Sequence, residues 1–221
     1  MFRCGHRERL RQKFLDGNLA DYEKLELMLG YVVPRRDMRP LAHALIKRFG
    51  SLARVISAPM DELLLVPGVG RNIAIFLKLV HDMVLIGYRD AMGNCPIFYD
   101  INLLKNYCKW AYADKPVEEI HVLYLDGDYR LLQDELHNSG TCNAASLYVR
   151  EIVRHALKLN STGVVLVHNH PASDSTFSSQ DIDTTAEVKK LFDGLGIKLY
   201  DHLLVSKHSI YSARDIGLLR D

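Results

Sequence analysis

Two histidines and an aspartate stand at a spacing that suits a metal ion. His168 and His170 end an apolar run, and Ser178-x-x-Asp181 follows after a loop. Alternate residues of a strand point to the same side, so the two imidazoles can meet at the strand's end. Asp181, one turn into the following helix, can bring its carboxylate to the same point. Two nitrogen ligands and one oxygen ligand, with a fourth position left for water, are typical of a catalytic zinc site.

Each half of this pattern also has a structural explanation. A His-x-His sequence often forms a polar strand end, and Ser178-x-x-Asp181 is a good capping sequence in which Ser178 caps a helix and Asp181 occupies its first turn. Their combination after a buried apolar strand favours the metal site. Other zinc signatures are absent, because the chain has neither a His-Glu-x-x-His helix nor the Pro-Cys-x-x-Cys of a deaminase. The letters His-Asn-His do not indicate an HNH nuclease, whose residues are spread over a longer unit.

The elements that position these residues belong to a mixed α/β pattern over residues 97–221. Asp126-Gly127-Asp128 separates two strand-like runs and is a hairpin signal. The short β-branched run before His168 predicts a buried strand. We therefore expect a mixed sheet flanked by helices. Strands are predicted at 120–125, 131–136, 164–167, 197–200 and 203–205, and helices at 100–113, 146–159 and 178–195.

Residues 1–90 are predicted to be helical throughout, because their apolar residues recur at helical spacing. Asp21 is the expected start of one helix, and Gly50 the expected end of another that Pro40 opens. Between 87 and 96 a polar, glycine-containing stretch interrupts the pattern. We place a domain boundary there, so the chain is predicted to have two domains, 1–90 and 97–221.

The charge distribution supports the same division. The 221 residues are 48% hydrophobic and 25% charged, which excludes disorder, collagen and coiled coil as descriptions of the whole chain. Lys and Arg total 28 against 27 Asp and Glu, a net charge of +1. Residues 1–90 hold 15 basic and 10 acidic side chains, or +5, and the remainder holds 13 and 17, or −4. Two oppositely charged halves suggest two modules with different partners.

A glycine-rich turn in the basic half fits a helix-hairpin-helix element. In the sequence 66–70, Gly68 and Gly70 let the backbone approach a partner closely, and Arg71 follows at the start of the next helix, whose N–H groups can face a phosphate. This predicts sequence-independent contact with the backbone of double-stranded DNA, which weakens with salt. The alternative is that the turn only packs two helices together and serves a protein contact.

Cysteine usage predicts a cytoplasmic protein with reduced thiols. Cys4, Cys95, Cys108 and Cys142 lie far apart, form no Cys-x-x-Cys pair and follow no secretory segment. The longest apolar stretches fall far below the roughly 18 residues that a membrane span requires. We therefore expect no membrane contact.

The pattern of motifs resembles the JAMM motif of JAB/MPN-type zinc metalloproteases and, within that superfamily, bacterial RadC proteins. The matching segments are His168 to Pro171 with Ser178 and Asp181, a glutamate about fifty residues upstream, Ser139-Gly140-Thr141, Arg150-Glu151, Asp201-His202, Tyr211-Ser212, and in the first half 25–30, 49–51 and 67–70. The family usually has Ser-Gly after His-Pro and proline before the motif serine, where this chain has Ala172-Ser173 and Phe177. The resemblance implies a cytidine-deaminase-like α/β fold with zinc held by His168, His170 and Asp181.

The resemblance also implies a general base. It assigns this role to Glu118, with Glu119 as the alternative, since strand alternation lets only one of the two face the metal. Without the family, Glu118 reads as a solvated carboxylate at a strand start. In the implied mechanism Glu118 takes a proton from water and passes it to the leaving amine, while Ser178 hydrogen-bonds the oxyanion. Asp201 and His202 either support the metal ligands or are polar core residues.

Three functions compete on this basis. The leading one is a zinc-dependent metallohydrolase that cleaves a peptide or isopeptide bond in a peptide or protein substrate. The second is a DNA-binding repair accessory protein whose metal site is structural or vestigial. The third is a metal-dependent nuclease.

Overall fold

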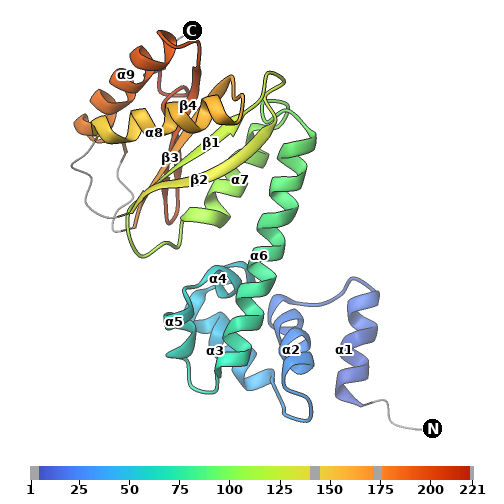
Figure 1. Cartoon of the computed structure of the whole chain (residues 1–221). Helices are drawn as coiled ribbons and strands as arrows, with labels where there is room; N and C mark the ends of the chain where they lie inside the picture. The colour runs from blue at the N-terminus through green and yellow to red at the C-terminus, as the bar shows by residue number, and fades with distance from the viewer. Residues whose placement is uncertain (1–4, 140–144, 172–175, 220–221) are drawn as a thin grey trace. The chain divides into compact units, whose positions relative to one another are not determined.

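The computed structural model describes residues 5–139, 145–171 and 176–219, and it divides the chain into two compact units. The first unit comprises residues 1–84 and the second comprises residues 85–221. Figure 1 shows the first as a group of helices and the second as a sheet with helices packed on it. Each unit is described by itself.

The first unit is all-helical, as its periodicity predicts. Ser51 caps one short helix by accepting a hydrogen bond from the Arg54 amide, and Gly50 ends the preceding helix with φ 91°. The core includes several fully buried leucines, among them Leu25, Leu45 and Leu77. The helices are α1 (His6–Leu15), α2 (Asp21–Val32), α3 (Arg39–Phe49), α4 (Leu52–Ser57), α5 (Met60–Leu64) and the first part of α6 (Arg71–Asn94).

The expected interruption between 87 and 96 is wrong. Helix α6 continues without a break for 24 residues to Asn94, through Gly87 and Gly93. A glycine inside a helix costs only about 1 kcal/mol relative to alanine. Met92 is fully buried in a core of the second unit, with Tyr88 packed against that core. Tertiary packing therefore outweighs the glycines, and the two compact units meet within α6, at Val84 and Leu85.

The second unit contains a five-stranded mixed sheet within its described residues, in the order β2-β1-β3-β4-β5. Strand β1 is antiparallel to both β2 and β3, β3 is parallel to β4, and β4 is antiparallel to β5. The Asp126-Gly127 hairpin is confirmed, since β1 and β2 pair across it. The strands are β1 (Glu119–Leu125), β2 (Leu131–Ser139), β3 (Gly163–His170), β4 (Lys198–Ser206) and β5 (Ile210–Ser212).

Helices cover both faces of this sheet (Figure 1). One face packs Val122, Val164 and Leu166 against residues of α8 (Ala145–Lys158) and α9 (Ser179–Asp193). The other packs alternate residues of the same strands against α7 (Ile101–Tyr112) and the end of α6. Because both faces are covered, β3 is buried along almost its whole length, as its continuous apolar run predicts.

Strand β4 replaces the two late strands that the sequence suggests. The prediction is interrupted at the polar pair Asp201-His202, but both side chains are buried inside one continuous strand. Asp201 accepts hydrogen bonds from the hydroxyl of Ser212 at 2.6 Å and from the backbone amide of Arg214 at 3.1 Å. Internal partners thus satisfy the polar groups, and no break in the strand is needed.

Gly163, the first residue of β3, is required for packing. A Cβ atom there would lie 2.7 Å from one ring carbon of Tyr200, closer still to the next, and 2.8 Å from the carbonyl oxygen of Lys198. We expect Gly163→Ala to lower the free energy of unfolding by about 3 kcal/mol, because the new methyl group overpacks the sheet. Urea denaturation followed by circular dichroism measures this. Gly127→Ala, whose nearest neighbour would lie 3.9 Å away, is the control and should change stability by less than about 0.5 kcal/mol; equal effects would contradict the packing argument.

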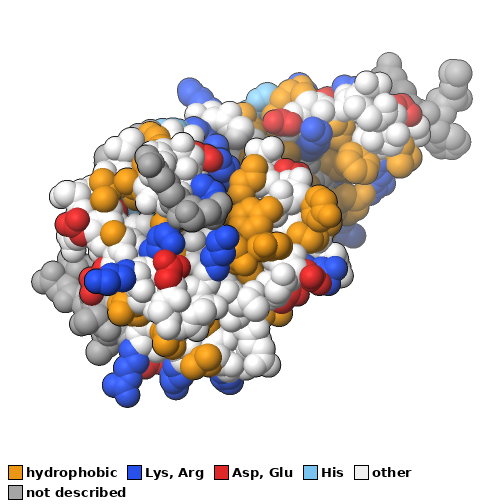
Figure 2. Space-filling view, turned by 90° about the horizontal axis from the view of Figure 1, so that it is seen from above, with side chains coloured by type: hydrophobic (Ala, Val, Ile, Leu, Met, Phe, Trp, Pro, Cys, Tyr) orange, Lys and Arg blue, Asp and Glu red, His pale blue; other side chains and the backbone are white. Residues whose placement is uncertain are grey.

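The surface is of mixed charge, as the nearly equal numbers of basic and acidic residues predict. On the face drawn in Figure 2, basic and acidic side chains lie interspersed around a hydrophobic area. None of the helices in the described ranges is both long and apolar enough to cross a membrane.

Candidate metal centre

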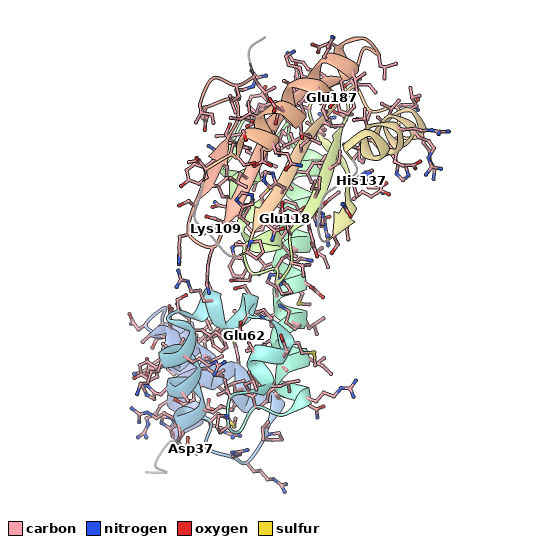
Figure 3. The ribbon with its side chains drawn as sticks, turned by 90° about the vertical axis from the view of Figure 1, so that its left-hand side faces the viewer. Asp37, Glu62, Lys109, Glu118, His137 and Glu187 are labelled. Atoms are coloured by element: carbon pink, nitrogen blue, oxygen red, sulfur yellow. The ribbon has the colours of Figure 1, made fainter. Side chains whose placement is uncertain are left out.

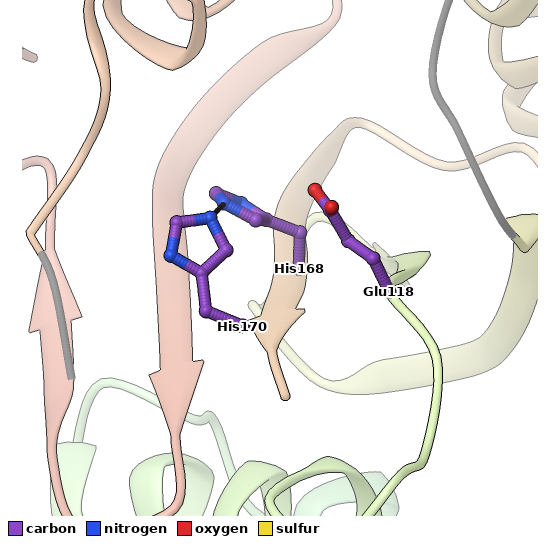
Figure 4. Close-up of side chains that lie close together, drawn as sticks. All are labelled: Glu118, His168 and His170. Carbon is purple, nitrogen blue, oxygen red and sulfur yellow. Dashed lines mark hydrogen bonds between the residues drawn. The ribbon is translucent and has the colours of Figure 1, made fainter. Parts of the chain in front are cut away.

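The carboxyl end of β3 brings the two histidines together. The Nε2 atoms of His168 and His170 lie 3.1 Å apart, on the same side of the strand (Figure 4). His168 is only 3% exposed, whereas His170 is half-buried. The i, i+2 spacing therefore places both imidazoles at one point, at the strand end where α/β sheets usually bind ligands.

Glu118 joins the two histidines. Among the described residues, Glu118, His168 and His170 form a group whose ligand atoms all lie within 4.8 Å of one another. Figure 4 shows the Glu118 carboxylate beside the two rings. Glu118 immediately precedes β1, whose residue Ile120 pairs with His168 across the ladder, so the register of β1 on β3 brings this side chain to the histidines.

Glu119 has different partners. Its carboxylate lies 3.0 Å from Nε2 of His121 and 3.1 Å from Nζ of Lys115. Burial raises the pKa of Glu119, but the hydrogen bonds from His121 and Lys115 outweigh that effect and lower it overall. Of the two neighbouring glutamates, the one that faces the histidines is thus Glu118, which Figure 3 labels beside the sheet.

Asn169 fixes the position of Glu118. Its side-chain oxygen accepts from the backbone amide of Glu119 at 2.8 Å, and its side-chain nitrogen donates to the carbonyl of Val117 at 3.0 Å. The residue between the two histidines therefore holds the backbone on both sides of Glu118. Sequence reasoning missed this role. The available signal was a polar side chain at the end of a strand that is otherwise apolar.

Asp181 serves both as a cap and as a neighbour of the histidines. Its Oδ2 accepts from the hydroxyl of Ser178 at 2.7 Å and from the Ser178 amide at 2.8 Å, which completes a capping box at the start of α9. Its Oδ1 lies 3.5 Å from Nε2 of His168. Asp181 is not a member of the 4.8 Å group. The capping arrangement and the metal arrangement are thus compatible, because the cap holds one carboxylate oxygen and directs the other toward His168.

A chain of hydrogen bonds determines which nitrogen of His168 carries the proton. The hydroxyl of Thr185 donates to the backbone carbonyl of Asp181 at 2.5 Å, so its oxygen must accept from Nδ1 of His202, 2.7 Å away. Nε2 of His202 lies 2.8 Å from Nδ1 of His168. If His202 is neutral, this Nε2 accepts the proton of His168 Nδ1. The lone pair of His168 Nε2 is then directed toward His170 and Glu118.

Burial keeps these imidazoles neutral. It lowers the pKa of His168 to about 4, and it lowers the pKa of His202 well below the usual value. Metal ions bind the neutral form of histidine. A phenyl ring adds to this enclosure, since Phe177 lies 6.0 Å from the His168 ring and 5.1 Å from the His202 ring, centroid to centroid.

This donor set fits zinc. Two imidazole nitrogens and nearby carboxylate oxygens are the types of ligand that catalytic zinc sites use. In such sites the ring nitrogen that does not bind the metal is usually hydrogen-bonded, as Nδ1 of His168 is to His202. The described cysteines lie elsewhere, with Cys95 exposed and Cys108, a residue of α7, buried in the core between this helix and the sheet. No closed thiolate site is thus formed by the described residues.

The hydrogen-bond chain makes a prediction about Thr185. Thr185→Val keeps the shape of the side chain but removes the acceptor for His202, so we expect zinc affinity to fall by about 10- to 100-fold. Competition with a chelating dye measures this affinity. The control is Thr184→Val on the same helix, which should bind zinc like the wild type. Wild-type affinity in Thr185→Val would show that the chain does not orient His168.

The turn between α5 and α6 contains a glycine in the left-handed region of backbone conformation. Gly68 has φ 94°, and the amide of Val69 donates to the carbonyl of Val66 at 3.0 Å. Gly70 and Arg71 are exposed at the start of α6. The guanidinium of Arg36 lies beside this turn, 3.5 Å from where a Cβ of Gly68 would stand.

The fold and the site together define a class of protein. The second unit has a mixed sheet with helices on both faces, and a His-x-His strand end lies beside the N-terminus of a helix. These features fit a JAB-like domain. Comparison with known proteins names the family. Residues 98–218 match the family described as the RadC-like JAB domain. The chain is also 38% identical over 217 residues to a UPF0758 protein of Ruegeria pomeroyi, covering 97% of each. The chain belongs to the RadC family.

Some of the residues that the sequence analysis names lie outside the described residues. These are Gly140 and Thr141 of the Ser-Gly-Thr segment, the departures Ala172 and Ser173, and the cysteines Cys4 and Cys142.

Proposed function

We propose that the chain is a zinc-dependent hydrolase that cleaves a peptide or isopeptide bond by a JAMM-type mechanism. The observation that carries this proposal is the carboxylate of Glu118 beside the imidazoles of His168 and His170, with the ligand atoms of all three residues within 4.8 Å of one another. A carboxylate within reach of a metal site, supplied by a different element, suits a general base. We also propose that the second unit has a cytidine-deaminase-like fold, as the resemblance to the family implies.

The residues that would hold zinc are His168, His170 and Asp181. Once bound, zinc would act as a Lewis acid toward the scissile carbonyl and make water nucleophilic near neutral pH. Glu118 stands beside the two imidazoles, and Oδ1 of Asp181 faces one of them, so the water and the base share one small space.

The protein's own groups then move one proton. Glu118 accepts it from the attacking water as the carbon–oxygen bond forms, and delivers it to the leaving nitrogen as the carbon–nitrogen bond breaks. Ser178 would turn its hydroxyl from Asp181 to the oxyanion of the tetrahedral intermediate. Phe177 and the buried chain of imidazoles keep bulk water away from the far side of the site.

The experiment is hydrolysis of quenched peptides and of lysine-linked isopeptides by the purified chain. The proposal expects cleavage that chelation abolishes and added zinc restores. The same preparations are tested on duplex DNA. Cleavage of phosphodiester bonds in place of peptides would support the nuclease alternative. No cleavage in either assay, with or without added zinc, would support a vestigial site.

A second candidate function is contact with duplex DNA through a helix-hairpin-helix element at 66–71. It is favoured by the positive φ of Gly68 and by the exposed Gly70 and Arg71 at the start of a 24-residue helix. Duplex binding should weaken steeply with salt, and Arg71→Ala should reduce both the affinity and the salt slope, the latter by about one. Binding that does not depend on salt would exclude it. This function is compatible with a repair accessory role.

A further inference from the structure

A cavity of about 620 Å³ lies in the helical unit, between α1, α2 and residues 35–39. Its volume falls in the range of about 300–1,000 Å³ that small-molecule sites occupy. The residues that line it all belong to the first unit, so it is separate from the candidate metal centre. Asp37, labelled in Figure 3, belongs to its lining.

Arginines dominate this cavity. Five of them line it, against two carboxylates. Arg11 pairs with Glu8 at 2.9 Å. Within the described ranges, Arg35, Arg36 and Arg39 have no carboxylate within ion-pair distance of their guanidinium groups. Guanidinium groups without a carboxylate at ion-pair distance are suitable donors for binding phosphate bidentately.

A buried carboxylate oxygen in the same lining lacks a donor. Glu26 is only 5% exposed, and its Oε1 lies 2.7 Å from Nε2 of His6. Its Oε2 is buried with no hydrogen-bond partner among the described residues. An unpaired buried carboxylate oxygen costs free energy, and an N–H group of a bound molecule can remove that cost.

The remaining wall offers an aromatic ring and a fixed backbone. Tyr31 lines the cavity and is 63% exposed; the guanidinium of Arg11 lies 5.7 Å from its ring centroid, and a base can stack on the other face of the ring. The guanidinium of Arg7 donates to the backbone carbonyl of Arg36 at 2.6 Å, which ties α1 to the segment 35–39. Arg35 itself has φ 72°, which is uncommon for a residue other than glycine.

We propose that this cavity binds a nucleoside diphosphate. The phosphates lie against Arg35 and Arg39, and an N–H donor of the base pairs with Oε2 of Glu26. The arginines and the carboxylate lie in one hollow, so a single ligand satisfies both. A phosphate alone uses only the arginines and leaves Glu26 unpaired.

Calorimetry with GDP, ADP and inorganic pyrophosphate tests this site on the full chain. We expect both nucleotides to bind more tightly than pyrophosphate. The double variant Arg35→Ala/Arg39→Ala should bind all three at least about a hundredfold more weakly, because it loses two charge-assisted contacts to phosphate and each is worth about tenfold or more in affinity. Glu26→Ala should lose the preference for nucleotides and keep its pyrophosphate affinity. Circular dichroism establishes that each variant is folded.

The matched control is Arg9→Ala, an exposed arginine of α1 that does not line the cavity. Its nucleotide affinity should stay within about twofold of the wild type, which is well under 1 kcal/mol. Absence of nucleotide binding at concentrations on the order of 1 mM would overturn the proposal, as would equal weakening in Arg9→Ala. A 5′-phosphorylated oligonucleotide is tested alongside. If it binds through Arg35 and Arg39 while GDP and ADP do not, the cavity is a contact for DNA ends and the nucleotide assignment fails.

Discussion

Glu118→Gln is expected to bind zinc like the wild type and to lose peptide hydrolysis by a factor of about 10²–10⁴. The amide has the same shape as the carboxylate but cannot accept the proton of the attacking water. His168, His170 and Asp181 remain unchanged, so zinc is retained. The measurement is kcat/KM on a peptide that the wild type cleaves, together with zinc content on the same samples.

The neighbouring glutamate provides the control for this variant. Glu119→Gln alters a carboxylate that pairs with His121 and Lys115 and does not belong to the group around the histidines. We expect it to keep most of the hydrolytic activity. Equal losses in the two variants would show a structural effect, and full activity in Glu118→Gln would remove Glu118 from the mechanism. Loss of DNA cleavage in Glu118→Gln, in a chain that cleaves no peptide, would favour a nuclease.

His168→Ala is expected to abolish zinc binding and the stability that zinc confers. In the wild type, zinc at a hundred times its dissociation constant should raise the free energy of unfolding by about 2.7 kcal/mol. The variant loses the ligand, so its unfolding midpoint should be the same with and without zinc. Urea denaturation of both proteins, with zinc and with a chelator, measures the difference.

Two further variants separate metal loss from damage to the core. His168 is buried, and removing it also breaks the contact with His202. His170 is only half-buried, so His170→Ala should lose the zinc-dependent stabilisation with a smaller loss in the chelated form. His43→Ala, an exposed histidine of the first unit, should respond to zinc like the wild type. A zinc-dependent shift that persists in His168→Ala and His170→Ala would place the metal elsewhere.

Much of the fold follows from local patterns. Helical periodicity and the cap at Gly50 predict the first unit, and the Asp126-Gly127 turn predicts the β1–β2 hairpin, because these signals depend on neighbours in sequence. The errors fall where tertiary contacts decide. Burial of Met92 extends α6 past Gly87, and the partners of Asp201 join two short strands into one.

The site could be predicted only in part. The alternation of a strand is enough to place His168 beside His170. The choice of Glu118 over Glu119 depends on the pairing of Ile120 with His168, which no local pattern encodes. Two supporting residues can be recognised only in the folded structure. Asn169 holds the backbone on both sides of Glu118, and Thr185 hydrogen-bonds to His202.

The arginine cavity of the first unit shows the same limit. Its basic residues are visible in the sequence as an excess of positive charge, and the sequence places the expected phosphate contact at the turn 66–71, not in this cavity. They lie on α1 and on the segment 35–39, and only the folding of these parts around α2 gathers them beside Glu26.

Zinc K-edge X-ray absorption of the purified wild-type chain tests the central claim most directly. The account predicts about one zinc per chain, with two imidazoles and otherwise oxygen in its coordination shell and no sulfur. A chain that takes up no zinc would contradict it, as would a spectrum with thiolate ligands.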